Sequence, residues 1–335
     1  MEKIFSAILI SFIIAVLIAK PILTLLKRLK IKQTIYHYVE AHKGKAGTPT
    51  MGGILFIVAI FLASIFLFDY NYSLALICIT VMLGYAILGF LDDFIKIKFK
   101  QNEGLKPYQK IIGQLAIATI IAFFAFNSPY IGSSILVPFF NTELDLGYLF
   151  IPFVIFVFLA VTNGVNLTDG LDGLAGGVSL IYFIGFAFIL SFFMTRQIDL
   201  GVGQALIGEY GNLLTVCGAT IGSLLAYLIF NSHPASVFMG DTGSLALGGL
   251  ITSVSIVTKL SLFVPILGFL FAMSALSVLL QVLYYKRTKK RIFKMAPLHH
   301  HFEKSGMNET KIVAIYMIIT TMIVTITVLI ELLVN

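Results

Sequence analysis

The sequence predicts an all-α, polytopic membrane protein in which residues 1–335 form one integral membrane domain, and two observations support this. The chain is 59% hydrophobic and only 12% charged, whereas ordinary soluble domains carry about 25% charged residues. Its apolar runs also recur at the length that crosses a bilayer as a helix, roughly 17–25 residues. A soluble core cannot account for so many runs, and little of the chain is left for a separate domain.

Ten spans are expected in chain order. The first run, Ile4–Ala19, leads straight into Lys20 and Pro21 without a small-residue cleavage site, so we expect a retained span and not a signal peptide. The ninth contains Pro265 and is expected to bend there. The approximate spans are 4–26, 51–68, 73–91, 108–126, 148–163, 174–193, 208–230, 244–258, 260–285 and 311–333.

The basic residues predict the orientation of these spans. Most of the 23 lysines and arginines lie in segments 27–50, 92–110 and 286–310, each of which follows an odd-numbered span. The positive-inside rule places these segments in the cytoplasm and both termini outside. The alternative role for the basic segments is only to set topology and contact anionic lipid headgroups. The longest outer segment, 127–147, alternates apolar residues around Pro138 and is expected to form a small β-hairpin.

Several classes of site are excluded by what the sequence lacks. Cys78 and Cys217 lie in different apolar runs, so no disulfide framework or thiolate metal cluster is expected. The glycine-rich segment that ends in GTPTMGG carries threonines and lysines that suit a polar ligand, but it is not a Walker A loop. The chain also lacks a dinucleotide-binding fingerprint, so any nucleotide would bind in a less familiar way.

Aspartates at the predicted cytoplasmic ends of spans are the main functional signal. They are Asp92, Asp93, Asp169, Asp172 and Asp241, supplied by three different links. The positive-inside rule favours lysine and arginine there and gives no reason for aspartate. Carboxylates at a membrane boundary that topology does not require are candidates for function.

The stretch 163–177, NGVNLTDGLDGLAGG, is the richest of these links. If it is helical, the three-residue spacing puts Asp169 and Asp172 on one face, and its glycines let a backbone approach a ligand closely. The alternative is that one of these aspartates caps the next helix. A cap needs one carboxylate, however, and it explains neither the second aspartate nor Asn163 and Asn166.

Asp92 and Asp93 close the third span at its predicted C-terminus. Anions are disfavoured at that end of a helix dipole by roughly 0.3–1 kcal/mol each. Either a bound cation or substrate compensates for them, or the neighbouring Lys96 and Lys100 neutralise them.

Asp241 lies in FNSHPASVFMGDTGS, before the eighth span, with Asn231 and Phe238. One interpretation is that Asp241 caps the eighth span with help from Thr242 and Ser244. The other is a binding role, in which Phe238 offers a stacking face to a base instead of packing in the core.

His299, His300 and His301 follow one another in the last basic link. Neighbouring residues of a helix do not face each other, and no cysteine accompanies them, so a structural zinc site is not expected. Side chains that hydrogen-bond or charge near pH 7 suit phosphate contact. Solvated loop histidines are the alternative.

Together these groups predict phosphoryl transfer at one membrane face. Carboxylates without thiols favour Mg²⁺, which takes one or two carboxylates plus substrate phosphates. Positioning and charge neutralisation do most of the work in such reactions, and a site at the bilayer edge can join a soluble nucleotide donor to a lipid acceptor. A secondary transporter is the rival of another class, but it would place ionisable groups near the bilayer midplane.

Five motifs, in this order along nearly the whole chain, resemble the polyprenyl-phosphate phosphosugar transferases and most closely the phospho-N-acetylmuramoyl-pentapeptide transferase family. The most discriminating is PLHHHFE, because relatives that use UDP-N-acetylglucosamine tend to carry a different histidine pattern there. The match among Lys100, Lys106 and Lys110 stays open, because that loop is less regular. The motifs are GTPTMGG at 47–53, LDDFIK at 91–96, NGVNLTDGLDGLAGG at 163–177, FNSHPASVFMGDTGS at 230–244 and PLHHHFE at 297–303.

The resemblance implies a Mg²⁺-dependent enzyme of the bacterial plasma membrane with its active site facing the cytoplasm. It would transfer phospho-N-acetylmuramoyl-pentapeptide from UDP-MurNAc-pentapeptide to undecaprenyl phosphate, giving lipid I and UMP for peptidoglycan synthesis. The expected partners are these two substrates, membrane lipids and a second copy of the chain in a homodimer, with no nucleic acid. A UDP-N-acetylglucosamine:polyprenyl-phosphate transferase is the enzymatic alternative.

The resemblance also assigns roles to residues. Asp241 would be the metal ligand, with Asp92 and Asp93 beside the reacting phosphates. The implied catalytic residues are Asp92, Asp93, Asp241, His299 and His300, and the implied substrate-binding residues are Lys45, Thr50, Lys100, Lys110, Asn166, Asp169, Asp172, Asn231, Phe238, Gly240, Ser244, Gln281 and His301.

Overall fold

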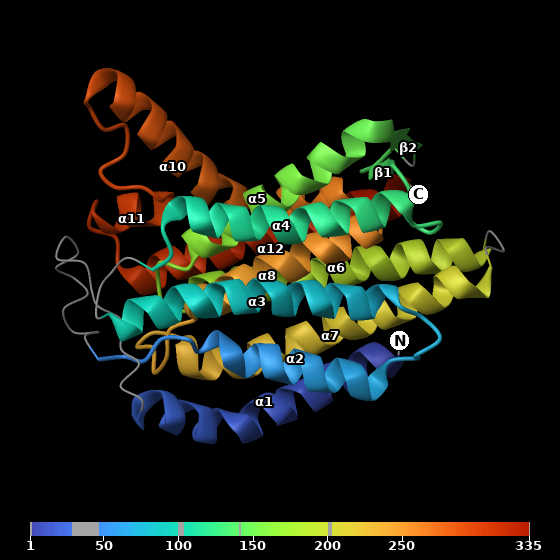
Figure 1. The fold of residues 1–335 in the computed structure, drawn as a ribbon, viewed down its shortest axis with the longest axis horizontal. Helices are drawn as coiled ribbons and strands as arrows, with labels where there is room; N and C mark the ends of the chain where they lie inside the picture. Colours follow the sequence, from blue (N-terminus) through green and yellow to red (C-terminus); the bar gives the residue numbers. More distant parts are fainter. Residues whose placement is uncertain (1, 29–46, 100–103, 141, 200–202, 335) are drawn as a thin grey trace.

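A computed structural model describes residues 2–28, 47–99, 104–140, 142–199 and 203–334, and most of these residues are helical (Figure 1). The long helices are α1 (Glu2–Arg28), α2 (Gly53–Leu67), α3 (Leu74–Lys98), α4 (Pro107–Asn127), α5 (Phe150–Thr168), α6 (Leu174–Asp199), α7 (Gln204–Asn231), α8 (Gly240–Val257), α10 (Phe269–Thr288) and α12 (Glu309–Val334). The short elements are β1 (Ser134–Val137), β2 (Thr142–Asp145), η2 (Gly147–Leu149), η3 (Ser261–Phe263), α9 (Val264–Leu267) and α11 (Leu298–Glu303).

The prediction of an all-α polytopic membrane protein is confirmed in its architecture. In the described part of the chain, nine helices are long and apolar enough to cross a membrane. The remaining long helix, α2, has 15 residues, which at 1.5 Å per residue is about 22 Å, shorter than the roughly 30 Å hydrocarbon core. These ten helices follow the ten predicted spans in order.

The centre of the bundle is formed by α7 and α8, the two spans with the largest buried share. Helices α3 and α5 pack on α8, while α1, α2 and α6 pack on α7. The α3–α8 contact is close because Gly89 faces the backbone of Asp241: a Cβ on Gly89 would lie 2.1 Å from the Asp241 carbonyl oxygen. Small residues let membrane helices approach in this way, and here the approach brings the C-terminal end of α3 to the start of α8.

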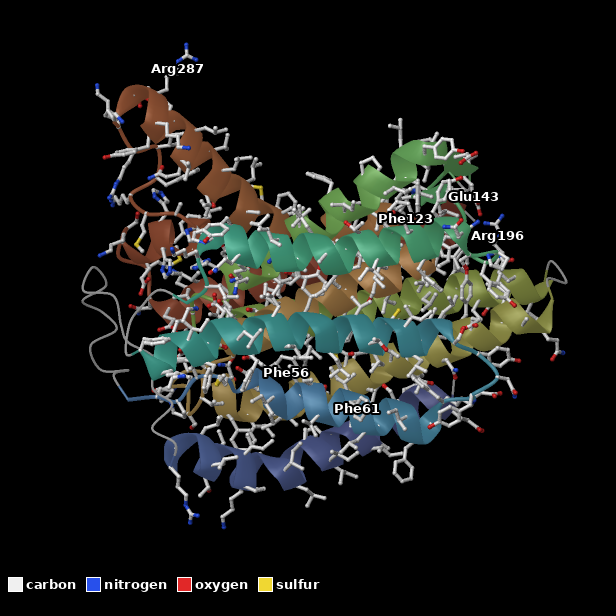
Figure 2. The ribbon with its side chains drawn as sticks, viewed as in Figure 1. Phe56, Phe61, Phe123, Glu143, Arg196 and Arg287 are labelled. Carbon is white, nitrogen blue, oxygen red and sulfur yellow. The ribbon has the colours of Figure 1, made fainter. Side chains whose placement is uncertain are left out.

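Different structural elements lie at the two ends of the helix bundle. Both chain termini and the β1–β2 hairpin lie at one end, and α10 and α11 lie toward the other (Figure 1). The strands are antiparallel with Ile135 opposite Leu144, which confirms the hairpin predicted within 127–147. Figure 2 shows Glu143 and Arg196 at the hairpin end, and Arg287 pointing away from the bundle at the free end of α10.

The predicted ninth span is interrupted, but not at Pro265. Proline occupies the first turn of the four-residue helix α9, where its missing N–H is not needed by the helix. The break comes at Gly268, whose φ of −94° and ψ of 29° separate α9 from α10. Helix α10 then leans away from the other helices (Figure 1), so the predicted bend exists three residues later than expected.

Candidate active site

An acid cluster forms where the C-terminal part of α3 meets the first turn of α8. Asp92, Asp93 and Asp241 each offer a carboxylate oxygen, and these oxygens lie within 4.8 Å of one another. Asp92 and Asp93 are each only 3% exposed. The start of α8 is the positive end of its dipole, so it favours the anions that the end of α3 disfavours.

Asp93 serves as the cap of α8. Its Oδ2 accepts hydrogen bonds from the Thr242 N–H (2.9 Å) and the Thr242 hydroxyl (2.7 Å), and its Oδ1 accepts the Asp241 N–H at 3.2 Å. The α8 N-cap position itself, Met239, makes no side-chain cap. The interpretation that Asp241 caps its own helix is therefore wrong: a carboxylate from another helix takes that role, and Asp241 faces the cations.

Asp241 is the point where four helices meet. Its Oδ2 accepts hydrogen bonds from the Nζ atoms of Lys96 on α3 and Lys110 on α4, both at 2.9 Å. Its Oδ1 accepts the Asn166 Nδ2 of α5 at 2.6 Å. Lys96 Nζ also lies 2.5 Å from Asp92 Oδ2, so the predicted neutralisation by Lys96 is present; Lys100 lies outside the described residues.

Two layers of amides and hydroxyls support this contact from within the bundle. Asn166 Nδ2 also donates to the buried Ser244 Oγ at 2.8 Å. One turn deeper, Asn163 Nδ2 donates to Gln114 Oε1 at 2.9 Å. Since Gln114 follows Lys110 by one turn, this amide pair fixes α4 and α5 next to the acid cluster.

The stretch 163–177 is not one helix. Helix α5 ends at Thr168 and α6 begins at Leu174, so Asp169 and Asp172 stand on a linker and serve different partners. The Gly240 N–H donates to the half-buried Asp169, while Asp172 Oδ2 accepts the Ala235 N–H at 3.1 Å. Desolvation raises the pKa of Asp169 well above its usual value, and the nearby carboxylates raise this pKa further.

The first and fourth motifs lie side by side. The Phe238 N–H donates to the Pro49 carbonyl, and the Gly52 N–H donates to the Phe238 carbonyl, both at 2.8 Å. Gly240 has a φ of +73°, and a Cβ on it would lie 2.8 Å from Thr50 Oγ1 and 2.6 Å from Asp93 Oδ2. The Phe238 side chain is half-buried beside this contact.

Two of the three histidines approach the linker after α5. His299 is fully buried, neither ring nitrogen has a hydrogen-bond partner, and a Cβ on Gly170 would lie 2.2 Å from its Nε2. Burial lowers the pKa of His299 to about 3, so its ring is neutral near pH 7. His300 Nδ1 lies 2.8 Å from Glu303 Oε2, and its Nε2 also comes close to Gly170.

Other predicted site residues hold the loops together. The Asn231 Oδ1 accepts the Gly173 N–H at 3.1 Å, and its Nδ2 donates to the Val237 carbonyl at 2.9 Å, so it connects the third and fourth motifs. Gln281 binds the backbone of residues 292–293, and His301 Nδ1 accepts the Lys294 N–H at 3.1 Å. Their bonds support the segment after α10 and do not reach the acid cluster. Lys45 lies outside the described residues.

A second group lies beside Asp172, and the sequence pattern did not reveal two of its members. His233 Nδ1 is 3.1 Å from Asp172 Oδ2 and 3.4 Å from Glu309 Oε2. Glu309 Oε1 also accepts the Asp172 N–H at 2.7 Å. The group links the loop before α6, the loop before α8 and the first turn of α12. Glu309 follows no recognisable motif, so only the packing of α12 could identify it.

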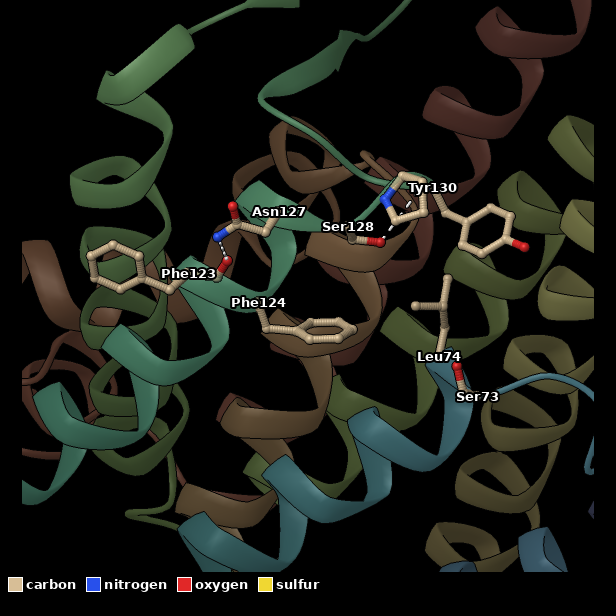
Figure 3. Close-up of a pocket in the computed structure, with 8 residues that line it drawn as sticks. Ser73, Leu74, Phe123, Phe124, Asn127, Ser128 and Tyr130 are labelled. Atoms are coloured by element: carbon tan, nitrogen blue, oxygen red, sulfur yellow. Dashed lines mark hydrogen bonds between the residues drawn. The ribbon is translucent and has the colours of Figure 1, made fainter.

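A cavity of about 510 Å³ lies elsewhere in the molecule. Figure 3 shows it between the first turn of α3 and the end of α4, with Phe124 and Leu74 facing the space. Leu74 precedes Asp92 by 18 residues of one helix, about 27 Å. This cavity is therefore not part of the acid cluster. Its lining residues are Ser73, Leu74, Phe123, Phe124, Asn127, Ser128, Pro129 and Tyr130.

Comparison with known proteins gives a consistent result. The profile of glycosyl transferase family 4 matches residues 76–259, more than half of the chain, and phospho-N-acetylmuramoyl-pentapeptide-transferase signature 1 matches residues 45–57. A phospho-N-acetylmuramoyl-pentapeptide-transferase of Clostridium kluyveri is 44% identical over 96% of this chain and 98% of its own length. Proteins of the same name are 44% identical in Clostridioides difficile, over 94% of both chains, and 43% identical in Caldanaerobacter subterraneus, over 95% of this chain and 96% of the relative.

Proposed function

This chain belongs to the phospho-N-acetylmuramoyl-pentapeptide transferase family, and from that premise we propose that it transfers phospho-N-acetylmuramoyl-pentapeptide from UDP-MurNAc-pentapeptide to undecaprenyl phosphate. The products are lipid I and UMP, in the service of peptidoglycan synthesis and cell-wall growth. The single observation that carries this proposal is the convergence of Asp92, Asp241, Lys96, Lys110 and Asn166 from four helices. That convergence supplies both a cation site and counter-charges for phosphate.

The acid cluster suits Mg²⁺. Asp92 Oδ2 is buried and faces the Lys96 ammonium instead of a backbone amide, so this oxygen is not committed to the backbone and can be given to an ion. Mg²⁺ binds oxygen ligands at about 2.1 Å, and one oxygen from each of the three carboxylates already lies within 4.8 Å of the other two. Asp241 and Asp92 would be the ligands, while Asp93 stays occupied with the Thr242 cap.

The chain's own residues prepare an in-line displacement. The lipid phosphate has a second pKa of about 6 and is largely dianionic at pH 7, so its main need is relief from repulsion by the donor diphosphate. Lys96 and Lys110 supply positive charge, and Asn166 holds Asp241 in place. A bound Mg²⁺ would screen the diphosphate.

Direct attack by the lipid phosphate on the β-phosphorus is favoured over a covalent route. A two-step reaction would pass through a phospho-aspartate. The two routes differ in one observable: a covalent route releases UMP before the lipid arrives. Incubation of the protein with donor and Mg²⁺, with the lipid omitted, should therefore give no stoichiometric burst of UMP, and a burst would overturn direct attack.

The donor would lie over the linker after α5 and the loop before α8. Phe238 is half-buried and lies two residues before Gly240, whose N–H donates to Asp169, and its ring would offer a stacking face for uracil. The neutral His299, together with His300, approaches the same linker through Gly170 and would contact the phosphates or the sugar. Asp172 and Asn231 hold the two loops against each other.

The arrangement of the ends supports a cytoplasmic site in the plasma membrane. The acid cluster, at the C-terminal end of α3 and the start of α8, lies at the end of the bundle opposite both termini and the hairpin (Figure 1). Among the described basic residues, Lys96, Lys98 and those of the last turn of α10 lie toward the same end. The positive-inside rule then places the site in the cytoplasm, where a UDP-linked donor is available. We also propose a homodimer with lipid-facing outer helices, as the family resemblance implies.

One competition assay tests the proposed function. Purified protein receives undecaprenyl phosphate and Mg²⁺ with equal amounts of UDP-MurNAc-pentapeptide and UDP-N-acetylglucosamine, and the lipid product is weighed by mass spectrometry. The expected product carries the MurNAc-pentapeptide. A product that carries only N-acetylglucosamine would assign the enzymatic alternative, and flux of a radiolabelled solute into liposomes with no lipid product would assign a transporter.

A further inference from the structure

Lys96 occupies the middle of the acid cluster. Its Nζ lies 2.5 Å from Asp92 Oδ2, 2.9 Å from Asp241 Oδ2 and 3.9 Å from Asp93 Oδ1. These are the three carboxylates whose oxygens are close enough together to hold a metal ion. One ammonium group therefore stands where a divalent cation would have to bind.

Lys96 differs from Lys110, the other lysine at Asp241. The Lys110 side chain is 16% exposed and its Nζ contacts Asp241 and Asn166. The Lys96 side chain is 31% exposed and lies in the last turn of α3. A long, flexible stem with a path to solvent can move its charge without unpacking the helix.

Each carboxylate of the cluster keeps another anchor when Lys96 leaves. Asp92 Oδ1 accepts the Leu105 N–H at 2.9 Å, and Asp93 holds Thr242. Asp241 is bound by Asn166 and Lys110. Departure of Lys96 would thus leave each acid with a hydrogen-bond partner, but of the two described lysines that contact the cluster only Lys110 would remain to compensate its negative charge.

We propose that the Lys96 ammonium is the counterion that holds the acid cluster together before metal binds, and that a divalent cation binds by displacing it. An ammonium and a divalent cation repel each other and compete for the same oxygens. The displaced Lys96 then reaches the phosphates of the substrates, where a mobile ammonium is a suitable partner. This inference rests on the proposed function for the identity of the cation and the phosphates.

A metal-binding titration without substrate tests the exchange. The variant Lys96→Met keeps most of the side-chain volume and removes the charge. The matched control is Lys98→Met, two residues away on α3, where the ammonium lies over the Phe94 and Phe99 rings and not at the acid cluster. Free Mn²⁺ is followed by electron paramagnetic resonance during titration of each purified protein, and melting temperature is measured in EDTA and in Mg²⁺.

Loss of the competing charge should tighten Mn²⁺ binding by Lys96→Met about tenfold relative to Lys98→Met, equivalent to roughly 1.4 kcal/mol. In EDTA the melting temperature of Lys96→Met should fall below that of the control, and Mg²⁺ should restore it. Equal or weaker Mn²⁺ affinity in folded Lys96→Met would overturn the proposal, as would the absence of Mn²⁺ binding from every protein. Retention of full kcat by a variant with tightened binding would overturn the phosphate contact.

The titration contains neither donor nor lipid, so its result is independent of the transfer reaction. If Lys96→Met binds Mn²⁺ more tightly and the wild-type protein fails to make lipid I, then the counterion exchange stands and the proposed function fails. If lipid I forms and the Mn²⁺ affinity does not change, then the function stands and the exchange fails.

Discussion

Buried carboxylates occur at both ends of this bundle, and helix α3 connects the two. At the hairpin end, Glu209 of α7 is 3% exposed, and its two oxygens accept the Ser73 and Leu74 N–H groups at 2.9 and 2.8 Å. These are the first amides of α3, which have no partner within the helix. Glu209 therefore provides hydrogen-bond acceptors for the first N–H groups of α3, and both of its carboxylate oxygens are hydrogen-bonded.

At the other end of α3 the carboxylates are bonded differently. One Asp92 oxygen accepts a backbone N–H and the other faces the Lys96 ammonium. Asp241 is held by two lysines and an amide side chain. Side-chain ammonium groups can leave, but backbone amides of a helix cannot. The comparison shows that burial alone does not identify a functional acid, because the type of partner decides whether a carboxylate is available to a ligand.

Neutralisation of Asp241, at the end of the bundle that holds the acid cluster, should have the largest effect on turnover. Asp241→Asn keeps the size of the side chain but weakens the attraction to Lys96, Lys110 and a bound cation. We expect a loss of turnover of roughly 10²–10³-fold, the usual cost of removing one electrostatic group from an active site, and a weaker dependence on Mg²⁺. The rate of lipid I formation against Mg²⁺ concentration measures both. A near-normal rate would remove Asp241 from the reaction.

The corresponding change at the hairpin end should affect stability instead. Glu209→Ala leaves two helix-terminal amides without a buried acceptor, and hydrogen bonds to charged groups contribute about 1.5–3 kcal/mol each. We expect the free energy of unfolding to fall by about 3 kcal/mol, which should be measurable as a lower melting temperature. Glu209→Gln, which retains one acceptor oxygen, should lose less.

The turnover number per folded molecule distinguishes the role of Glu209 from that of Asp241. Glu209→Ala should keep kcat within a few-fold of wild type at a temperature where it is folded. A large fall in kcat with no change in melting temperature would contradict the contrast drawn between Glu209 and Asp241.

Low pH should destabilise the folded protein because His299 is buried as a neutral ring. Its folded-state pKa of about 3 lies below the unfolded value of about 6.5. The unfolded chain therefore binds a proton that the folded chain excludes once pH falls below 6.5. The stability is fully present above that pH and is lost as pH falls toward 3, by about 2 kcal/mol between pH 8 and pH 5.

The variant His299→Gln isolates this contribution, because an amide does not titrate. Melting temperature is measured from pH 8 to pH 5 for the wild type and the variant, and the wild type should lose more. Parallel curves would show that His299 does not stay neutral and buried in the folded protein.

The smallest expected effect concerns the donor. Phe238→Ala removes the proposed stacking face, and base–aromatic stacking contributes roughly 1–3 kcal/mol, so the donor KM should rise about tenfold. The kcat should fall less than the KM rises, because the lost contact binds ground state and transition state alike. An unchanged donor KM would place Phe238 outside the nucleotide site.

Much of the fold could be predicted because membrane helices form from local sequence. Backbone groups within a bilayer must be hydrogen-bonded inside each segment, so every long apolar run becomes a helix, and the alternation in 127–147 becomes a hairpin. The end of the bundle that holds the acid cluster could be predicted from the aspartates at the boundaries of the spans. Lys96 could be predicted only as the last residue of LDDFIK and as a neutralising neighbour of Asp92 and Asp93, because its contact with Asp241 is not local in the sequence.

The partners of each charged group could not be predicted in the same way. Asp93 lies 149 residues before Thr242, which it binds, and Lys96 lies 145 residues before Asp241. Which carboxylate caps α8 depends on the approach of Gly89 to Asp241, and that approach is a property of packed helices. The same holds for Gln281: the resemblance implies a role in substrate binding, and the hydrogen bonds of its side chain to residues 292–293 were not apparent from the sequence.

The sequence by itself therefore determined the helical membrane architecture, the order of the spans and the boundary at which the acids gather. Hydrogen-bonding demand in a membrane is met locally, so local sequence is enough to specify it. The tertiary structure alone decided that Asp93 became a cap while Asp241 and Asp92 share the Lys96 ammonium. Those choices follow from distances between helices that are remote in the chain, and only their packing sets such distances.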